Sequence, residues 1–411
     1  MAKVDVYLNS LFSGVLAKEG EQHIFSYDHD AGDLVSVTMP VRAQSYQYPN
    51  LHPIFQMNLP EGILKEAIER ATAKHYGSDD LTMLTLLGNN QIGRLSYARE
   101  GQDYKQIEHE VPTLQELLTN KDATLFSQLL ERYAMQSGVA GIQPKVLMDL
   151  PDGLIPNIDK KATLPLTGYI VKSWGPEYSE LGCNEFVCLT LAREAGLKVA
   201  DFSLSENAKL LVTKRFDIAE PIGNDDRQFL GFEDFCVLQG RGTREKYDAS
   251  IESCANTIQQ FVSAPYKKQA LYDFFKLTLI NCVIRNGDAH LKNIGILYPD
   301  PNRKPQHAAN AHFECRMAPV FDLVSTVPYI PNDTMALSLT GSKRWPKWSV
   351  LKTFGKQHCQ LSTKDIDCCV SEVEQARERV LPLLNDLAKR HESFAPIADV
   401  MRELMKEGGF E

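Results

Sequence analysis

The sequence lacks the features that mark membrane, secreted and repetitive proteins. No window holds the roughly 18 apolar residues needed to cross a bilayer, and the first twenty residues lack the apolar core and small-residue cleavage site of a signal peptide. No tract rich in glycine, proline or serine separates folded parts, and no internal repeat is present. We therefore expect a folded chain that stays in the cytoplasm and does not bind membranes.

An excess of positive charge is also missing. The chain has 44 Lys and Arg against 53 Asp and Glu, which gives a net charge of -9. Because affinity for nucleic acids comes largely from neutralising phosphates, we expect contact with DNA only indirectly, through a basic partner. The nine cysteines are odd in number and scattered, which predicts free thiols in a reducing compartment.

The overall amino-acid composition is that of an ordinary globular protein, with 43% hydrophobic and 24% charged residues. A length of 411 residues exceeds one ordinary domain. Alternating or β-branched runs at 4–8, 23–27 and 33–41 predict strands near the N-terminus. We predict an α+β fold in three parts: a β-rich N-terminal unit at 1–105, a compact α+β lobe at 106–239 and a helical lobe at 240–411.

The second and third parts have distinct patterns. Strand patterns at 146–150, 168–174 and 210–217 surround a helical pattern at 184–196, which predicts a small sheet with one helix. Residues 267–286 are apolar on nearly every side, as in a helix at the centre of a helical lobe.

The most informative motif is IRNGDAHLKNIGILY at 284–298. Asp288 lies in a glycine-containing loop, five positions before Asn293, which opens an apolar strand pattern. This is the spacing of a kinase catalytic loop, where a carboxylate orients the acceptor hydroxyl and accepts its proton while an amide oxygen helps to hold Mg²⁺. The alternative is that Asp288 caps a turn and Asn293 tolerates a left-handed bend.

A second carboxylate follows in MAPVFDLVS, where Asp322 ends a short apolar run. This is the position of the metal-binding Asp that follows a kinase catalytic loop, and hard oxygen ligands assisted by substrate phosphates are typical of Mg²⁺ sites. An ordinary aspartate at a strand end is the alternative.

A lysine and a glutamate complete the pattern. Lys172 lies in the strand pattern GYIVKSW, and Glu185 follows thirteen residues later at the start of a helical pattern. In kinases such a pair positions ATP phosphates. A surface lysine and a glutamate favoured by the helix dipole are the alternative.

Taken together, the motifs resemble the HipA-type kinases, toxins of bacterial persistence and toxin–antitoxin modules. The resemblance covers nearly the whole chain. It is carried by HPIFQMNLPEG, GIQPK, YIVKSW, NEFVCLTLAREAG, VTKRFD, FEDFCVLQG, NGDAHLKNIGILY and APVFDLVS. It implies a two-lobed core similar to protein kinases, with an added N-terminal subdomain.

The resemblance also implies site residues. It makes Lys172 and Glu185 the ATP-phosphate pair, Asp288 the catalytic base, and Asn293 and Asp322 the Mg²⁺ ligands. VTKRFD would be the hinge between the lobes, and GIQPK the flap over the phosphates. The nucleotide contacts implied there are backbone groups of Lys214 and Phe216 with adenine, Asp217 with the ribose, and Gly141, Gln143 and Lys145 in the flap.

One position departs from the family pattern. Many HipA proteins are phosphorylated on a serine three residues before the flap glycine, and that position is Gly138 here, with Ser137 displaced by one residue. One residue moves a hydroxyl by about 3.5 Å, so Ser137 is our candidate for autophosphorylation.

The function implied is ATP-dependent phosphorylation of serine or threonine in a protein, an aminoacyl-tRNA synthetase in the family, which inhibits translation. The implied partner is a small helix-turn-helix antitoxin of the HipB type that holds the toxin on operator DNA. Two alternatives stay open. One is a small-molecule kinase with the same fold, and the other is an ATP-binding pseudokinase that acts as a co-repressor or binding module.

Overall fold

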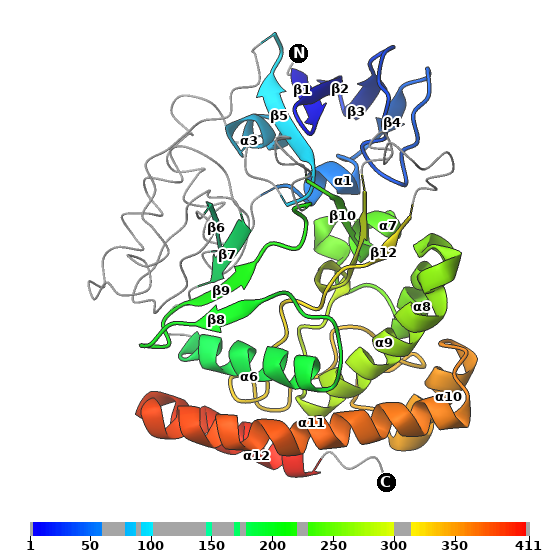
Figure 1. Cartoon of the computed structure of the whole chain (residues 1–411). Coiled ribbons are helices and arrows are strands. Elements are labelled where there is room, and N and C mark those ends of the chain that lie inside the picture. The colour runs from blue at the N-terminus through cyan, green and yellow to red at the C-terminus, as the bar shows by residue number, and fades with distance from the viewer. Residues whose placement is uncertain are drawn as a thin grey trace, which may run out of the picture.

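A computed structural model (Figure 1) describes most of the chain. None of the helices in the described part is long and apolar enough to span a membrane. All nine cysteines are free thiols, and Cys368 alone is exposed. The described residues are 3–59, 79–87, 92–101, 145–149 (backbone only), 168–172, 178–219, 229–299 and 314–407.

The N-terminal unit is built on a five-stranded antiparallel sheet in the order β4-β3-β2-β1-β5. Alternate residues of β1 enter a core that also holds Phe25, Phe55 and Tyr97. Two of the strands predicted in this region are therefore present, as β1 and β3. The elements are β1 (Lys3–Leu8), β2 (Leu11–Glu19), β3 (Gln22–Tyr27), β4 (Tyr46–Tyr48), α1 (Pro53–Gln56), α3 (Asp80–Leu87) and β5 (Leu95–Arg99).

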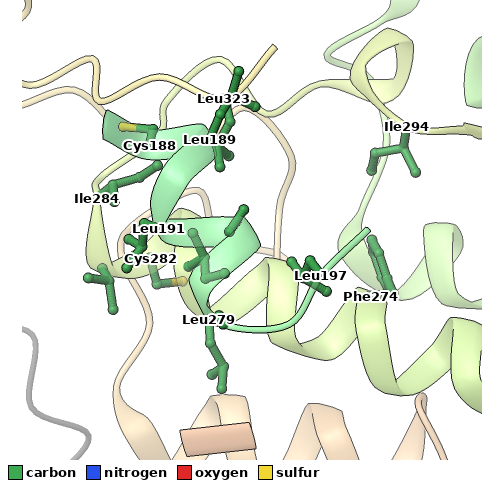
Figure 2. Close-up of a cluster of buried hydrophobic side chains, with 14 of the residues drawn as sticks. Cys188, Leu189, Leu191, Leu197, Phe274, Leu279, Cys282, Ile284, Ile294 and Leu323 are labelled. Carbon is green, nitrogen blue, oxygen red and sulfur yellow. The ribbon is translucent and has the colours of Figure 1, made fainter. Parts of the chain in front are cut away.

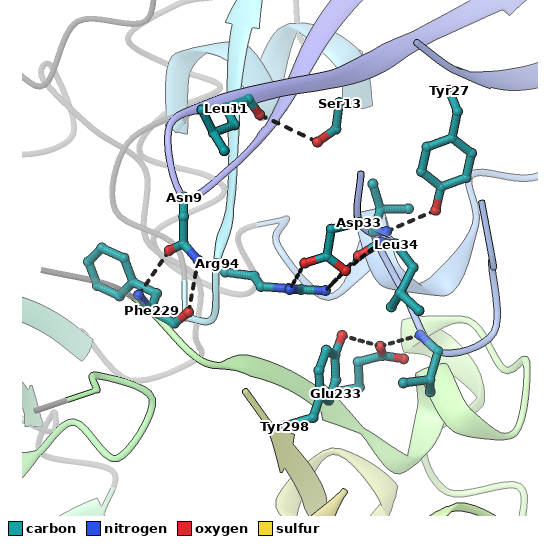
Figure 3. Close-up of polar contacts among 12 residues, drawn as sticks. Asn9, Leu11, Ser13, Tyr27, Asp33, Leu34, Arg94, Phe229, Glu233 and Tyr298 are labelled. Carbon is teal, nitrogen blue, oxygen red and sulfur yellow. Dashed lines mark hydrogen bonds and ion pairs between the residues drawn. The ribbon is translucent and has the colours of Figure 1, made fainter. Parts of the chain in front are cut away.

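The run at 33–41 was expected to be a third strand, and this prediction is wrong. The segment contains only an isolated bridge between Ser36 and Met39. Its polar groups bond to distant residues, because Asp33 pairs with Arg94 and Val37 N donates a 2.7 Å hydrogen bond to Glu233 Oε1 (Figure 3). These bonds hold the segment as a loop against the rest of the protein.

The second sheet has four antiparallel strands in the order β6-β7-β9-β8. Helix α6 contacts β8 and β9, and its buried residues join those of β9 in one core. The strands and helix predicted for this part are present. They are β6 (Lys145–Asp149), β7 (Gly168–Lys172), α6 (Leu181–Glu194), β8 (Phe202–Leu204) and β9 (Leu211–Lys214).

A third sheet, in the order β10-β11-β12, connects the second part to the helical lobe. Its strands are β10 (Gly231–Asp234), β11 (Gly295–Tyr298) and β12 (Arg316–Met317), with α7 (Phe235–Leu238) following β10. Because β10 pairs with β11, it lies with the later elements of the chain. The boundaries predicted at 105/106 and 239/240 stay predictions.

The last part is helical. Its core joins α6 to the central helix α9, with side chains such as Leu191 and Cys282 packed together (Figure 2). Helix α11 crosses beneath α6 and α9 and contacts both (Figure 1). The elements are η2 (Thr243–Glu245), α8 (Ile251–Phe261), α9 (Ala264–Val283), η3 (Leu291–Asn293), α10 (Trp348–Gln357), α11 (Thr363–Arg390), η4 (Glu392–Phe394) and α12 (Ala395–Glu407).

Side chains of the N-terminal unit bind the backbone next to β10. The amide of Asn9 donates to Phe229 O over 3.1 Å and accepts from Phe229 N over 2.9 Å (Figure 3). Asn9 has φ +46°, a left-handed conformation that asparagine tolerates better than most residues. The turn between β1 and β2 is therefore attached to the segment that enters the third sheet.

Candidate active site

Lys172 lies between two carboxylates from different parts of the chain. Its ammonium nitrogen is 2.5 Å from Glu185 Oε1 on α6, and it also contacts Asp322 Oδ1. Lys172 and Glu185 are buried, whereas the side chain of Asp322 is partly exposed. Burial alone would lower the pKa of Lys172, but the two carboxylates raise it above its ordinary value. The lysine is therefore a fixed positive charge beside Asp322.

The segment that carries Asp322 is held against α6. Asn184, one residue before Glu185, donates to Ser325 O and accepts from Ser325 N, both over 2.8 Å. Asp322 itself has φ +57°, a left-handed conformation that is uncommon away from glycine. The paired bonds to Asn184 hold the segment in place and so help to keep this strained residue beside Lys172.

The loop that contains Asp288 follows the end of α9. Asn286 fixes its first turn, because Asn286 Oδ1 accepts from Asp288 N over 3.0 Å while Asn286 Nδ2 donates to Asn281 over 2.9 Å. Gly287 N donates to Thr326 Oγ1 over 2.9 Å, which ties the loop to the segment of Asp322. A Cβ at Gly287 would lie 1.9 Å from a carboxylate oxygen of Asp333, so this position has no space for a side chain.

Asn293 closes the same loop. Its Nδ2 donates to Asp288 O over 2.8 Å, so the amide is oriented and its oxygen is the end that can act as a metal ligand. An amide oxygen and the Asp322 carboxylate are hard donors of the kind that Mg²⁺ prefers. The donor set of the site therefore fits Mg²⁺.

Two side chains that the sequence analysis missed lie beside Asp288. Tyr247 donates its hydroxyl to Asp288 Oδ1 over 2.8 Å, and His290 Nε2 is 3.8 Å from the same oxygen. Burial, followed by Lys246, lowers the pKa of His290 to about 3, so its ring is neutral at physiological pH. His290 lies within the recognised motif, but Tyr247 is 41 positions upstream and no spacing rule connects it to Asp288.

The three predicted hinge residues, Lys214, Phe216 and Asp217, have different surroundings. Lys214 N donates to Asp201 O over 2.7 Å, so a contact between that N–H and adenine requires this bond to open. The ring of Phe216 packs against Phe232 and Phe321, the residue before Asp322, with ring centroids 5.4 Å and 5.3 Å away. Phe216 therefore connects the hinge to the candidate metal ligand.

Asp217 is occupied by other protein groups. It is 1% exposed, Oδ1 accepts from Arg215 Nε over 2.9 Å, and Oδ2 accepts from Gly93 N over 2.6 Å. A carboxylate buried in this way already has hydrogen-bond partners within the protein, and the predicted contact with a ribose would require its surroundings to rearrange. We therefore leave Asp217 out of the site that we propose.

The flap residues are described only in part. Lys145 lies on β6, and the backbone register places it directly across from Lys172 on β7. Gly141, Gln143 and the candidate phosphorylation site Ser137 lie outside the described residues.

Comparison with known families settles the relationship of the chain. Residues 137–381 match the model of the HipA-like C-terminal domain, and residues 4–98 match the HipA N-terminal domain. The chain belongs to the HipA family. The resemblance predicted from the motifs is therefore confirmed.

Two curated relatives of this HipA-family chain come from Sinorhizobium fredii (strain NBRC 101917 / NGR234), and both carry provisional names as kinases. Y4dM is 28% identical over 389 residues, which cover 86% of this chain and 84% of Y4dM. Y4mE is 29% identical over 321 residues, which cover 72% of this chain and 69% of Y4mE. These names and the family membership support the interpretation that this chain is a kinase.

The HipA structure of Shewanella oneidensis MR-1, determined with HipB and operator DNA, is similar over nearly the full length. The TM-score is 0.70 at 18% identity, and the alignment covers 98% of this chain and 96% of that one. At this identity the likeness shows the fold alone. The predicted α+β, HipA-like architecture is confirmed.

Proposed function

We propose that this HipA-family chain is an ATP-dependent protein serine/threonine kinase. The observation that carries the proposal is the buried Lys172, which joins Glu185 of α6 to Asp322. A lysine held by a helix glutamate beside a metal-binding aspartate is the arrangement that orients ATP phosphates in protein kinases. Structural ion pairs can be buried in the same way, but this one is next to a loop with the spacing of a catalytic loop.

In the proposed mechanism, Lys172 neutralises charge on the phosphates of ATP and Glu185 keeps the lysine in position. Asp322 and the amide oxygen of Asn293 would hold Mg²⁺, which would supply positive charge to offset the negative charge of the ATP phosphates. Asp288 orients the acceptor hydroxyl and accepts its proton. Catalysis would come mainly from positioning and from preorganised charge.

We propose a serine or threonine of a protein as the acceptor, with an aminoacyl-tRNA synthetase as the first candidate, which rests on the family resemblance. A HipB-like antitoxin is the proposed partner, supported by the complex of the Shewanella HipA with HipB and operator DNA. A net charge of -9 is suited to a basic partner. Any contact with DNA would then be made through that partner.

The test is incubation with Mg-[γ-³²P]ATP and a bacterial cytosolic extract, followed by identification of labelled proteins. We compare wild type with Asp288→Asn, which removes the base at nearly constant size. Label on a synthetase that requires Asp288 supports the toxin kinase, and label on Ser137 supports autophosphorylation there.

The two alternatives give different results in the same experiment. Consumption of ATP that depends on Asp288, with label only in small molecules, favours a small-molecule kinase. Binding of ATP with no Asp288-dependent turnover in the complete extract favours a pseudokinase and excludes the proposal.

A further inference from the structure

We propose that Tyr247 is a positioning residue for the reaction, and that its hydroxyl holds the carboxylate of Asp288 in the orientation that accepts the proton. The inference rests on the proposed function. The contact that carries it is the 2.8 Å hydrogen bond from the Tyr247 hydroxyl to Asp288 Oδ1. The two residues are 41 positions apart, in the loop after η2 and in the loop after α9.

Tyr247 is held through its backbone and through its ring. Lys246 O accepts from Leu291 N over 3.1 Å, which joins the backbone before Tyr247 to the catalytic loop. Lys343 Nζ donates to Tyr247 O over 3.1 Å. The Tyr247 ring also meets His290 edge to face, with centroids 5.2 Å apart. The backbone of Tyr247 is therefore tied to the catalytic loop, and its partly exposed ring packs on His290.

The side chain of Asp288 benefits from such a restraint. Asn286 and Asn293 bond the backbone of Asp288, and these bonds do not fix its carboxylate. The carboxylate is 48% exposed, so solvent favours several rotamers. A base must be held close to its productive geometry, and a hydrogen bond from a rigid phenol restricts the carboxylate in this way.

Two basic residues, His290 and Lys246, also lie near this hydrogen bond. His290 is 3.8 Å from Asp288 Oδ1, but its buried ring is neutral. Lys246 lies over the Tyr247 ring, with its nitrogen 5.2 Å from the ring centroid. The hydrogen bond from Tyr247 is a directional contact on this carboxylate.

A different role is that Tyr247 blocks the base until an acceptor displaces it. The two roles predict opposite effects of removing the hydroxyl. A positioning residue makes transfer slower when it is lost, whereas a blocking residue makes transfer faster. The bonds that hold Tyr247 in place favour positioning.

The test compares wild type with Tyr247→Phe, which keeps the ring on His290 and removes only the hydroxyl. We measure the initial rate of ³²P transfer from Mg-[γ-³²P]ATP to proteins of a cytosolic extract, across a range of ATP concentrations. We expect the maximal rate to fall by about 10-fold or more, as for the loss of a hydrogen bond to a charged group. The KM for ATP should stay the same, because the residue acts on the acceptor side.

The matched control is Tyr266→Phe, at the start of α9. Tyr266 also donates a 2.8 Å hydrogen bond to a carboxylate, that of Glu314, outside the proposed site. Loss of the Tyr266 hydroxyl should leave the rate of ³²P transfer unchanged. Urea unfolding of both variants checks that they fold as wild type does.

An unchanged or increased maximal rate in Tyr247→Phe would overturn the inference, as would a rise in the KM for ATP that accounts for the whole effect. Failure of the proposed function looks different, because wild type itself would then give no label that depends on Asp288.

Discussion

Lys172 Nζ lies 2.5 Å from Glu185 Oε1, and this pair joins strand β7 to helix α6 below the second sheet. Glu185 is 1% exposed and Lys172 is 5% exposed. The same ammonium group contacts Asp322, 150 positions later in the chain. One side chain therefore connects the sheet, the helix and the candidate metal ligand.

Replacement of Lys172 by Met should abolish transfer and weaken the fold. The buried carboxylate of Glu185 and the partly exposed carboxylate of Asp322 would then lose their shared counter-charge, and breaking a buried pair costs about 3–5 kcal/mol. We expect transfer to fall by roughly 10²-fold or more, since a preorganised charge is lost. Urea unfolding and the ³²P assay measure the two effects.

Lys276→Met is the control for this variant. Lys276 is also buried, and it bonds Ala195 O over 2.8 Å and Glu372 over 2.7 Å, where the end of α6 meets α9 and α11. The Lys276→Met variant should be less stable than wild type, but its folded fraction should transfer phosphate at the wild-type rate. Equal rates for Lys172→Met and wild type would exclude a role for Lys172 in the reaction.

The sequence alone was sufficient to predict the elements that depend on local patterns. Asp288 and Asn293 share one loop, so their spacing alone placed them together, and the apolar patterns of α6 and α9 placed the helices. The contact between Lys172 and Glu185 was predicted and is present, although its role in binding ATP is still a proposal. Spacing could not reveal Tyr247, because its approach to Asp288 depends on how two distant loops pack.

Long-range hydrogen bonds also explain where the predictions failed or lost support. The run at 33–41 has the alternation of a strand, but Glu233 and Arg94 bind its polar groups and hold it as a loop. In the hinge, Asp217 has the expected sequence position, but Gly93 of the N-terminal unit bonds its carboxylate. Neither partner can be identified from local pattern.

Alanine at Gly287 should inactivate the protein without unfolding it. The added Cβ would lie 1.9 Å from Asp333 Oδ2 and 2.7 Å from Thr334 O, so the loop must shift next to Asp288. A displacement of about 1 Å costs roughly 10²-fold in rate. We would measure the maximal rate of ³²P transfer together with thermal unfolding.

Gly20→Ala provides the comparison, since Gly20 lies between β2 and β3 with nothing within 4 Å of an added Cβ. Its left-handed φ of +58° makes alanine cost about 1 kcal/mol of stability, but the rate should not change. Wild-type rates in Gly287→Ala would show that the loop tolerates displacement.

Stability should depend on pH through Glu233, a fully buried acid between the N-terminal unit and β11. Oε1 accepts from Tyr298 over 2.6 Å (Figure 3) and from Val37 N over 2.7 Å, while Oε2 is 2.8 Å from Ser36 Oγ. Burial raises the pKa of Glu233 from 4.5 to about 7, against the hydrogen bonds that lower it.

The direction in which stability changes with pH follows from which state of the protein binds the proton. Between pH 4.5 and about 7 the unfolded chain loses this proton and the folded chain keeps it, so the free energy of unfolding falls as pH rises. Glu233→Gln can keep the same hydrogen bonds without a charge. Its stability should match wild type near pH 4.5 and exceed it at pH 8 by on the order of 3 kcal/mol.

Urea unfolding from pH 4.5 to 8 measures this difference, and Glu19→Gln at the exposed end of β2 is the control, which should keep the wild-type pH dependence. A difference in stability between Glu233→Gln and wild type that stays constant from pH 4.5 to 8 would mean that the pKa of Glu233 is not raised in the folded protein.

The last prediction concerns Asp217 and the sugar of the nucleotide. Both carboxylate oxygens are bonded within the protein, so we expect ATP, 2′-deoxy-ATP and 3′-deoxy-ATP to bind wild type with affinities within about threefold of one another, measured by calorimetry with Mg²⁺. Loss of a sugar hydroxyl that bonded a carboxylate would cost about tenfold or more. Asp217→Asn should lower stability, because it weakens the buried pair with Arg215, and leave the ratio of ATP to deoxy-ATP affinities unchanged. A large preference for ATP that disappears in Asp217→Asn would instead mean that nucleotide binding breaks the contacts of Asp217 with Arg215 and Gly93, and that the N-terminal unit releases the hinge when ATP binds.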